Sequence, residues 1–291
     1  MEQKRWFDLY PDTPIDPAEW LHWSRGGLNW NTMCADCHST YLQKNYQADQ
    51  GIFNTQWAII NVSCEACHGP GKRHVDFVKS GQHRKGETYP AADAEHLLLT
   101  QSISSQTQVD QCARCHSRRV QISEVFDFHG TFMDHYAPEI LRDNIYYPDG
   151  QIRDEVYVYG SFRQSKMYHE GVKCTNCHDP HQAALKFTGN RLCTQCHASP
   201  TYDTPKHHFH PLNTESAQCV NCHMPGKYYM ANDFRRDHSF RIPRPDLSMR
   251  FETPNACNQC HTGQNAQWAA DAIENGTAKP PGALFRSPRA R

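Results

Sequence analysis

The chain has 291 residues, with 30 basic and 31 acidic side chains and a formal net charge of -1. Its apolar content of 38% and mean hydropathy of -0.80 are low for a core built from side chains alone. The 11% of aromatic residues argues against simple disorder, and no run of about 20 apolar residues predicts a membrane span in this chain.

Short helices are predicted at seven places that carry cysteine pairs. All fourteen cysteines fall in C-x-x-C pairs, and His follows every pair directly. With 19 His in 291 residues, chance alone would give seven such successors with odds on the order of one in 10⁸. In chain order, motifs one to seven are Cys34, Cys37 and His38; Cys64, Cys67 and His68; Cys112, Cys115 and His116; Cys174, Cys177 and His178; Cys193, Cys196 and His197; Cys219, Cys222 and His223; and Cys257, Cys260 and His261.

This spacing indicates covalently attached haem. Two thiols three positions apart reach the two vinyl groups of one porphyrin and form thioethers, and the next residue then lies under the iron. Its imidazole becomes the proximal ligand, as in other His-ligated haem proteins. The sequence therefore predicts seven haem c groups, with the motif cysteines as thioether donors and the motif histidines as proximal iron ligands.

Three other uses of paired cysteines fit the pattern less well. Structural zinc sites built from C-x-x-C pairs need no His directly after each pair and would use an even number of pairs. A disulfide framework would not confine every cysteine to this spacing, and redox C-x-x-C pairs come singly.

The remaining elements are few. Successive motifs start 30, 48, 62, 19, 26 and 38 residues apart, so no repeat period exists. Residues 93–99 are expected to be helical, as are residues 264–274. In the longest gap, the turn signal at 147–151 and the alternation at 154–159 predict a small hairpin. Residues 279–291 show no periodicity and are predicted to be a linker or frayed end.

The fold class expected is mainly α and loop-rich, with haems forming the core and little β structure beyond one hairpin near 145–160. Residues 1–263 are predicted to form a single multihaem domain with sub-regions 1–111, 112–173 and 174–263. Residues 264–291 would add a helix and a tail.

The haems change the expected charge and point to a compartment. Two propionates and one ferric porphyrin contribute about -1 per haem, so the holoprotein should be acidic and nucleic-acid binding is not expected. Haem is ligated to this motif on the far side of the bacterial inner membrane, which predicts a periplasmic, extracellular or surface location. No apolar signal segment stands at the N-terminus, so we expect that it was removed or that the chain is a piece of a longer protein.

Twelve further histidines are available as distal ligands, which would allow bis-His ligation at every iron. His74 and His181 lie too close to their own motifs to fold back onto those irons and are expected to serve neighbouring haems. The other ten are His22, His83, His96, His129, His135, His169, His207, His208, His210 and His238.

Position separates these ten. Within His207-His208-Phe209-His210, His208 and His210 are favoured as ligands. His238 is a candidate, and His22 lies between two tryptophans in a setting suited to a haem face. His83 is predicted to be solvated, and the choice stays open for His96, His129, His135 and His169.

Several segments resemble the cytochrome c-554/c-552 type, doubled C-x-x-C-H multihaem family. They are Val62–Gly71 with His74, Gly171–His181 and Cys219–Pro225. Pro254–His261 is similar to long members that continue into tetratricopeptide repeats. The resemblance implies a mostly helical, loop-rich fold with stacked and perpendicular haem pairs, and a chain that stops before any repeat.

The resemblance also raises an enzyme alternative, a multihaem oxidoreductase of the nitrite reductase or hydroxylamine oxidoreductase type with one open haem. No C-x-x-C-Lys motif is present, so no catalytic residue can be transferred and the catalytic residues stay unknown. Electron transfer through closed, bis-His haems is favoured, with other cytochromes or quinol-linked membrane proteins as redox partners. A partner-binding role in which haem is secondary is the third alternative.

Overall fold

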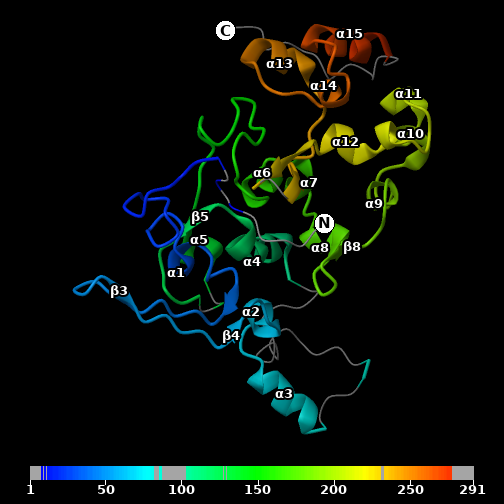
Figure 1. Cartoon of the computed structure of the whole chain (residues 1–291). Helices are drawn as coiled ribbons and strands as arrows, with labels where there is room; N and C mark the ends of the chain where they lie inside the picture. The colour runs from blue at the N-terminus through cyan, green and yellow to red at the C-terminus, as the bar shows by residue number, and fades with distance from the viewer. Residues whose placement is uncertain are drawn as a thin grey trace, which may run out of the picture. The chain divides into compact units, whose positions relative to one another are not determined.

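The structure, a computed structural model, describes residues 8, 10, 12–81, 85–86, 103–126, 128, 130–230 and 233–276. The chain divides into two compact units, unit 1 (Met1–Glu139) and unit 2 (Ile140–Arg291). Short helices joined by long loops make up both (Figure 1). The unit boundary falls inside the predicted sub-region 112–173, and the predicted domain limits stay a prediction.

In unit 1, the largest described element is α4 (Ser105–His116), whose first turn is capped by Ser104 accepting a hydrogen bond from the Thr107 backbone N–H at 3.0 Å. The other elements of this unit are α1 (Trp30–Met33), β1 (Ser39–Thr40), β2 (Tyr46–Gln47), β3 (Ile52–Phe53), β4 (Ile59–Ile60), α2 (Cys64–His68), α3 (Lys72–Lys79), β5 (Arg119–Gln121), α5 (Phe132–His135) and β6 (Tyr136–Pro138).

Unit 2 contains the remaining elements: α6 (Tyr159–Arg163), α7 (Lys166–His169), α8 (Cys174–Cys177), β7 (His178–Asp179), β8 (Ala184–Leu185), α9 (Arg191–Thr194), α10 (Ser199–Tyr202), α11 (Pro205–His208), the 3₁₀ helix η2 (Glu215–Ala217), α12 (Cys219–His223), β9 (Gly226–Tyr229), β10 (Asp233–Arg236), α13 (Pro245–Phe251), α14 (Ala256–Cys260) and α15 (Ala266–Gly276).

Strands in the described residues pair only as antiparallel two-stranded ladders. These are β1 with β4, β2 with β3, β5 with β6, β7 with β8, and β9 with β10. In the longest ladder, Asp233 lies opposite Tyr229 and Arg236 opposite Gly226. The mainly α, loop-rich class with little β structure is therefore confirmed. None of the described helices has the length and apolar character that a membrane crossing requires.

The hairpin predicted at 145–160 is confirmed only at its turn. Tyr146 and Ile152 form an isolated antiparallel bridge around it. The prediction of a strand over 154–159 is wrong, because Tyr157 adopts a left-handed φ of 59° and α6 begins at Tyr159. Val156 is buried with Ile145 and Tyr146 in a small core instead, so its alternation with polar neighbours reflects a packed loop.

The C-terminal helix predicted at 264–274 is confirmed by α15. The helix predicted at 93–99 and the tail at 279–291 lie outside the described residues. Among the described residues, Ile145, Tyr146 and Val156 form a small buried cluster, whereas several large apolar side chains beside the motifs are exposed. Around motif two, Ile59, Ile60 and Val62 are 50, 57 and 52% exposed. Apolar surface of this kind beside a C-x-x-C-H motif suits contact with a porphyrin face.

Candidate functional site

In five of the seven motifs both cysteines lie within a short helix, whereas the motif-one pair follows α1 and Cys196 of motif five lies just beyond α9. Helix α2 spans motif two, α12 spans motif six, and α4 ends with motif three. Residues three apart in a helix share one face, so both thiols of such a pair project to the same side. This local geometry matches two thioether bonds to one porphyrin edge, and the prediction that short helices carry the motifs is confirmed for motifs two, three, four, six and seven.

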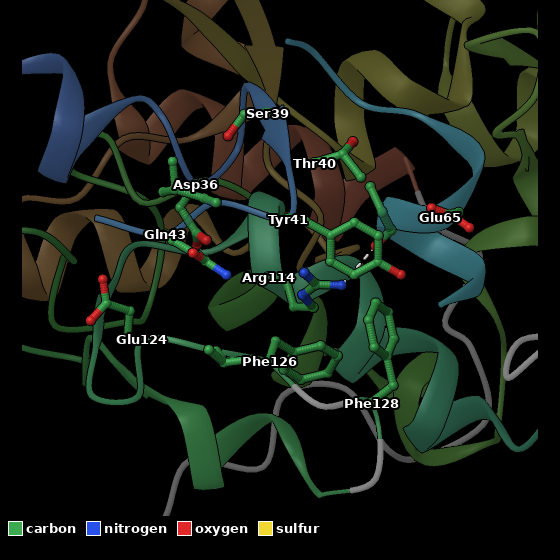
Figure 2. A pocket seen from close by; sticks show the side chains of 13 residues that line it. Asp36, Ser39, Thr40, Tyr41, Gln43, Glu65, Arg114, Glu124, Phe126 and Phe128 are labelled. Carbon is green, nitrogen blue, oxygen red and sulfur yellow. Dashed lines mark hydrogen bonds between the residues drawn. The ribbon is translucent and has the colours of Figure 1, made fainter. Parts of the chain in front are cut away.

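In unit 1, the residues between the cysteines of three motifs meet around one pocket. Figure 2 shows Asp36 of motif one, Glu65 of motif two and Arg114 of motif three among the residues that line it. The Arg114 Nη1 donates to the Ala66 carbonyl at 2.7 Å, which ties motif three to motif two. The Arg114 guanidinium also lies 4.0 Å from the centre of the Phe126 ring, within cation–π range.

A buried ion pair ties motif three to motif one. The Arg119 guanidinium binds the Asp36 carboxylate, with side chains 10 and 14% exposed, and its Nε donates to the Arg114 carbonyl at 2.8 Å. The same contact brings the Cys37 and Cys115 thiols together. Their mutual hydrogen bond lowers the pKa of Cys37 to about 7 and raises the pKa of Cys115. Motif three therefore contacts both other motifs of unit 1.

In unit 2, successive motifs are also neighbours. Between motifs four and five, Gln195 Nε2 donates to the Asn176 carbonyl at 3.3 Å. Between motifs five and six, Asn190 Oδ1 accepts from the Cys219 backbone N–H at 2.9 Å. The helices of motifs six and seven, α12 and α14, contact each other. Motifs four to seven thus follow one another in space as they do in the chain.

Three motif histidines of unit 2 each face a second histidine. The ring centres are 6.3 Å apart for His178 and His238, 6.0 Å for His207 and His223, and 6.1 Å for His210 and His261. The corresponding interplanar angles are 24°, 12° and 29°.

This spacing fits an iron between the rings. Two imidazoles on opposite sides of one metal would hold their centres roughly 6.2 Å apart, since a metal–nitrogen bond is about 2.0 Å and each nitrogen lies about 1.1 Å from its ring centre. The residues present therefore fit bis-His haem ligation at motifs four, six and seven.

Hydrogen bonds orient three of these rings. The Nδ1 atoms of His223, His238 and His210 lie 2.7, 2.9 and 2.5 Å from the backbone carbonyls of Arg241, Arg236 and His208, respectively. A ring nitrogen bonded to a carbonyl must donate, so Nδ1 carries the proton and Nε2 keeps the lone pair that a metal needs.

Desolvation also favours the neutral form of two of the imidazoles. Desolvation lowers the pKa of His178. The pKa of His207 is lowered by desolvation first and then by the neighbouring His223 and His208. A neutral imidazole is the form that binds iron.

Sequence reasoning passed over His207 and favoured His208, yet His207 is the residue whose ring faces His223. His208 instead buries its Nε2 atom without a hydrogen-bond partner. His135, left open by the sequence, is buried on α5 with Nδ1 3.1 Å from the Val125 carbonyl, the same arrangement as in the facing rings. No C-x-x-C-H motif stands beside His135 in the sequence, so the sequence alone did not indicate that this residue is buried.

The other distal candidates have local contacts. His22 Nδ1 lies 2.7 Å from the Ser24 hydroxyl, and its ring is 5.5 Å from Trp23. His74 lies on α3, and the His181 backbone N–H donates to the Asp179 carboxylate at 3.0 Å. Their roles as distal ligands stay predictions, as does that of His208. His83, His96 and His129 lie outside the described residues.

Two family models match the chain. The model for cytochrome c554 and c-prime matches residues 23–69, and the doubled CXXCH motif model matches residues 166–201. Each match includes two of the C-x-x-C-H motifs, motifs one and two in the first and motifs four and five in the second. The chain is a multihaem c-type cytochrome.

This cytochrome is similar to larger curated proteins. It is 24% identical to the multiheme cytochrome MtrA of Shewanella baltica over 66% of this chain and 45% of the relative. It is 23% identical to the dissimilatory sulfite reductase MccA of Wolinella succinogenes over 56% of this chain and 22% of the relative. The cytochrome thus spans less than half the length of these two relatives.

Among solved structures, this cytochrome resembles the outer cell wall cytochrome OcwA with a TM-score of 0.56 at 18% identity. The likeness covers 84% of this chain and 63% of OcwA, and it shows a shared fold. The expected continuation into tetratricopeptide repeats stays a prediction.

Proposed function

We propose that this cytochrome transfers electrons through seven covalently bound haem c groups, most of them bis-His ligated. The observation that carries the proposal is the set of three imidazole pairs with ring centres 6.0–6.3 Å apart. An iron with imidazoles on both sides has no position for substrate, so a haem of this kind exchanges electrons and does not bind a reactant.

The neighbouring motifs support a conduit. In unit 2, contacts link motif four to five, five to six and six to seven. In unit 1, motif three contacts motifs one and two. Haems attached to motifs in contact would lie close to one another, and closeness is what electron transfer between them requires.

The place of action proposed is the periplasm or the cell exterior, because haem attachment to this motif takes place beyond the bacterial inner membrane. The structurally similar OcwA is named as an outer cell wall cytochrome, which agrees with this proposal. The partners proposed are other cytochromes or quinol-linked membrane proteins, met through the acidic surface that the haem propionates create.

A second candidate is a multihaem oxidoreductase with one open iron. It is favoured by the similarity to a protein named as a dissimilatory sulfite reductase. Addition of carbon monoxide, nitrite or sulfite distinguishes the two functions. An all-closed carrier keeps its low-spin spectrum, whereas an open iron gives a high-spin band that shifts on ligand addition.

Intact mass combined with an optical spectrum of the mature protein tests the main proposal. We expect a mass excess of seven haems that survives denaturation, and a low-spin spectrum with reversible reduction. A mass equal to the bare polypeptide, or zinc in place of iron, would contradict it.

A further inference from the structure

One short segment of unit 2 places two imidazoles against two different motifs. Helix α11 ends with His207 and His208, and His210 follows two residues later. His207 faces His223 of motif six with ring planes 12° apart, while His210 faces His261 of motif seven with planes 29° apart. Two motifs that start 38 residues apart in sequence are therefore contacted from positions only three residues apart.

The backbone between the two rings explains how they separate. Phe209 follows the last residue of α11 and has a left-handed φ of 60°. Residues other than Gly adopt this conformation at a cost in free energy. This residue reverses the chain direction, so His210 leaves the line of the helix that carries His207. The reversed turn is closed by His210 Nδ1, which donates to the His208 carbonyl at 2.5 Å.

The two facing motifs are themselves held together. Helices α12 and α14, which carry motifs six and seven, contact each other. The His223 ring is fixed from a third direction by the Arg241 carbonyl, 2.7 Å from Nδ1.

We infer that His207 and His210 are the distal ligands of the haems of motifs six and seven, so that the segment His207–His210, here called the ligand strap, links the two irons. The inference rests on the proposed function, since it requires haem at both motifs. One consequence sets it apart from two independent ligands: a change in the strap backbone should disturb two haems at once.

Single substitutions test each ligand. In His207→Ala and in His210→Ala, we expect one low-spin haem to become high-spin with all haems still attached, and the double variant should give two. Added imidazole should restore the low-spin signal. Lys206→Ala, an exposed neighbour on α11, is the matched control and should keep every haem low-spin. Electron paramagnetic resonance counts the spin states, and intact mass counts the haems.

The irons can be assigned by removing one haem. With Cys219→Ser and Cys222→Ser, motif six cannot form thioethers, and the mass should fall by one haem. In this background His207→Ala should add no high-spin haem, whereas His210→Ala should still add one. If this background does not fold, the visible magnetic circular dichroism of the two single variants should still identify two different haems.

Phe209 tests the strap itself. Phe209→Val disfavours the left-handed φ and should raise the high-spin count by two, whereas Phe209→Gly accepts that φ and should leave both haems low-spin. The inference is contradicted if His207→Ala and His210→Ala leave all haems low-spin, or if both variants disturb the same haem. It is also contradicted if Phe209→Val makes fewer than two haems high-spin. A wild-type protein without covalent haem would overturn the proposed function instead.

Discussion

The Asp36 carboxylate lies inside motif one and is bound by the Arg119 guanidinium, which stands 83 positions later and just beyond motif three. The pair is largely shielded from solvent, and the Tyr136 hydroxyl donates a further hydrogen bond to Asp36 at 3.3 Å. This contact helps to hold motif one against motif three in unit 1, so the ion pair contributes to the position of their haems.

Asp36→Asn should therefore destabilise the holoprotein by about 3 kcal/mol, because it leaves a buried guanidinium without its counter-charge. Denaturant unfolding followed by the haem absorbance measures the change. Asp76→Asn is the matched control, since Asp76 pairs with Lys72 at the surface with side chains 58 and 85% exposed. That control should cost about 0.5 kcal/mol or less. Equal losses in the free energy of unfolding for the two variants would mean that the buried pair stabilises the protein no more than the surface pair does.

His238→Met should raise the reduction potential of one haem while leaving the haem count unchanged. The His238 ring faces His178, and a thioether in place of an imidazole stabilises ferrous iron. A spectroelectrochemical titration should show one haem displaced to higher potential. His238→Gly with added imidazole is the control and should return to the wild-type curve. An unaltered titration in His238→Met would remove His238 from the ligands.

Stability should fall as the pH drops below the ordinary His pKa of 6.5. Desolvation lowers the pKa of His178 and of His207 in the folded protein, and ligation to iron would hold both rings in the same neutral form, so the unfolded chain takes up protons at a higher pH than the native state. The unfolded state then binds more protons, and the free energy of unfolding rises with pH through this window. Thermal unfolding from about pH 7.5 to about pH 5 measures the slope. A melting temperature independent of pH over that range would contradict the prediction.

Val156→Ala should cost about 2 kcal/mol, because it opens a cavity in the small core of unit 2. Val156 is 2% exposed and packs with Ile145 and Tyr146. Val120→Ala is the control at a position 67% exposed, where about 0.5 kcal/mol or less is expected. Chemical denaturation compares the two variants, and a smaller loss for Val156→Ala than for Val120→Ala would show that this cluster is not a core.

The covalent chemistry of this protein could be predicted from the sequence because it is local. Two cysteines three positions apart and a following His share one side wherever the motif folds as a helical turn, as α2 and α12 show. The loop-rich fold followed from the same motifs and from the low apolar content. The strand predicted over 154–159 was wrong, because apolar and polar residues can alternate in a loop just as they do in a strand. Here the loop contains Tyr157 in a left-handed conformation.

Which histidines face each other could not be read from the chain order and required the folded chain. His207 and His208 are adjacent and chemically identical, but neighbouring positions on a helix point about 100° apart, and it is the His207 ring whose centre lies 6.0 Å from that of His223. His210 reaches His261 because Phe209 turns the backbone through a left-handed conformation that no motif announces. The residue order is thus sufficient for the chemistry that each motif can perform, whereas the direction of each opposing side chain depends on backbone reversals and on contacts between residues far apart in the chain.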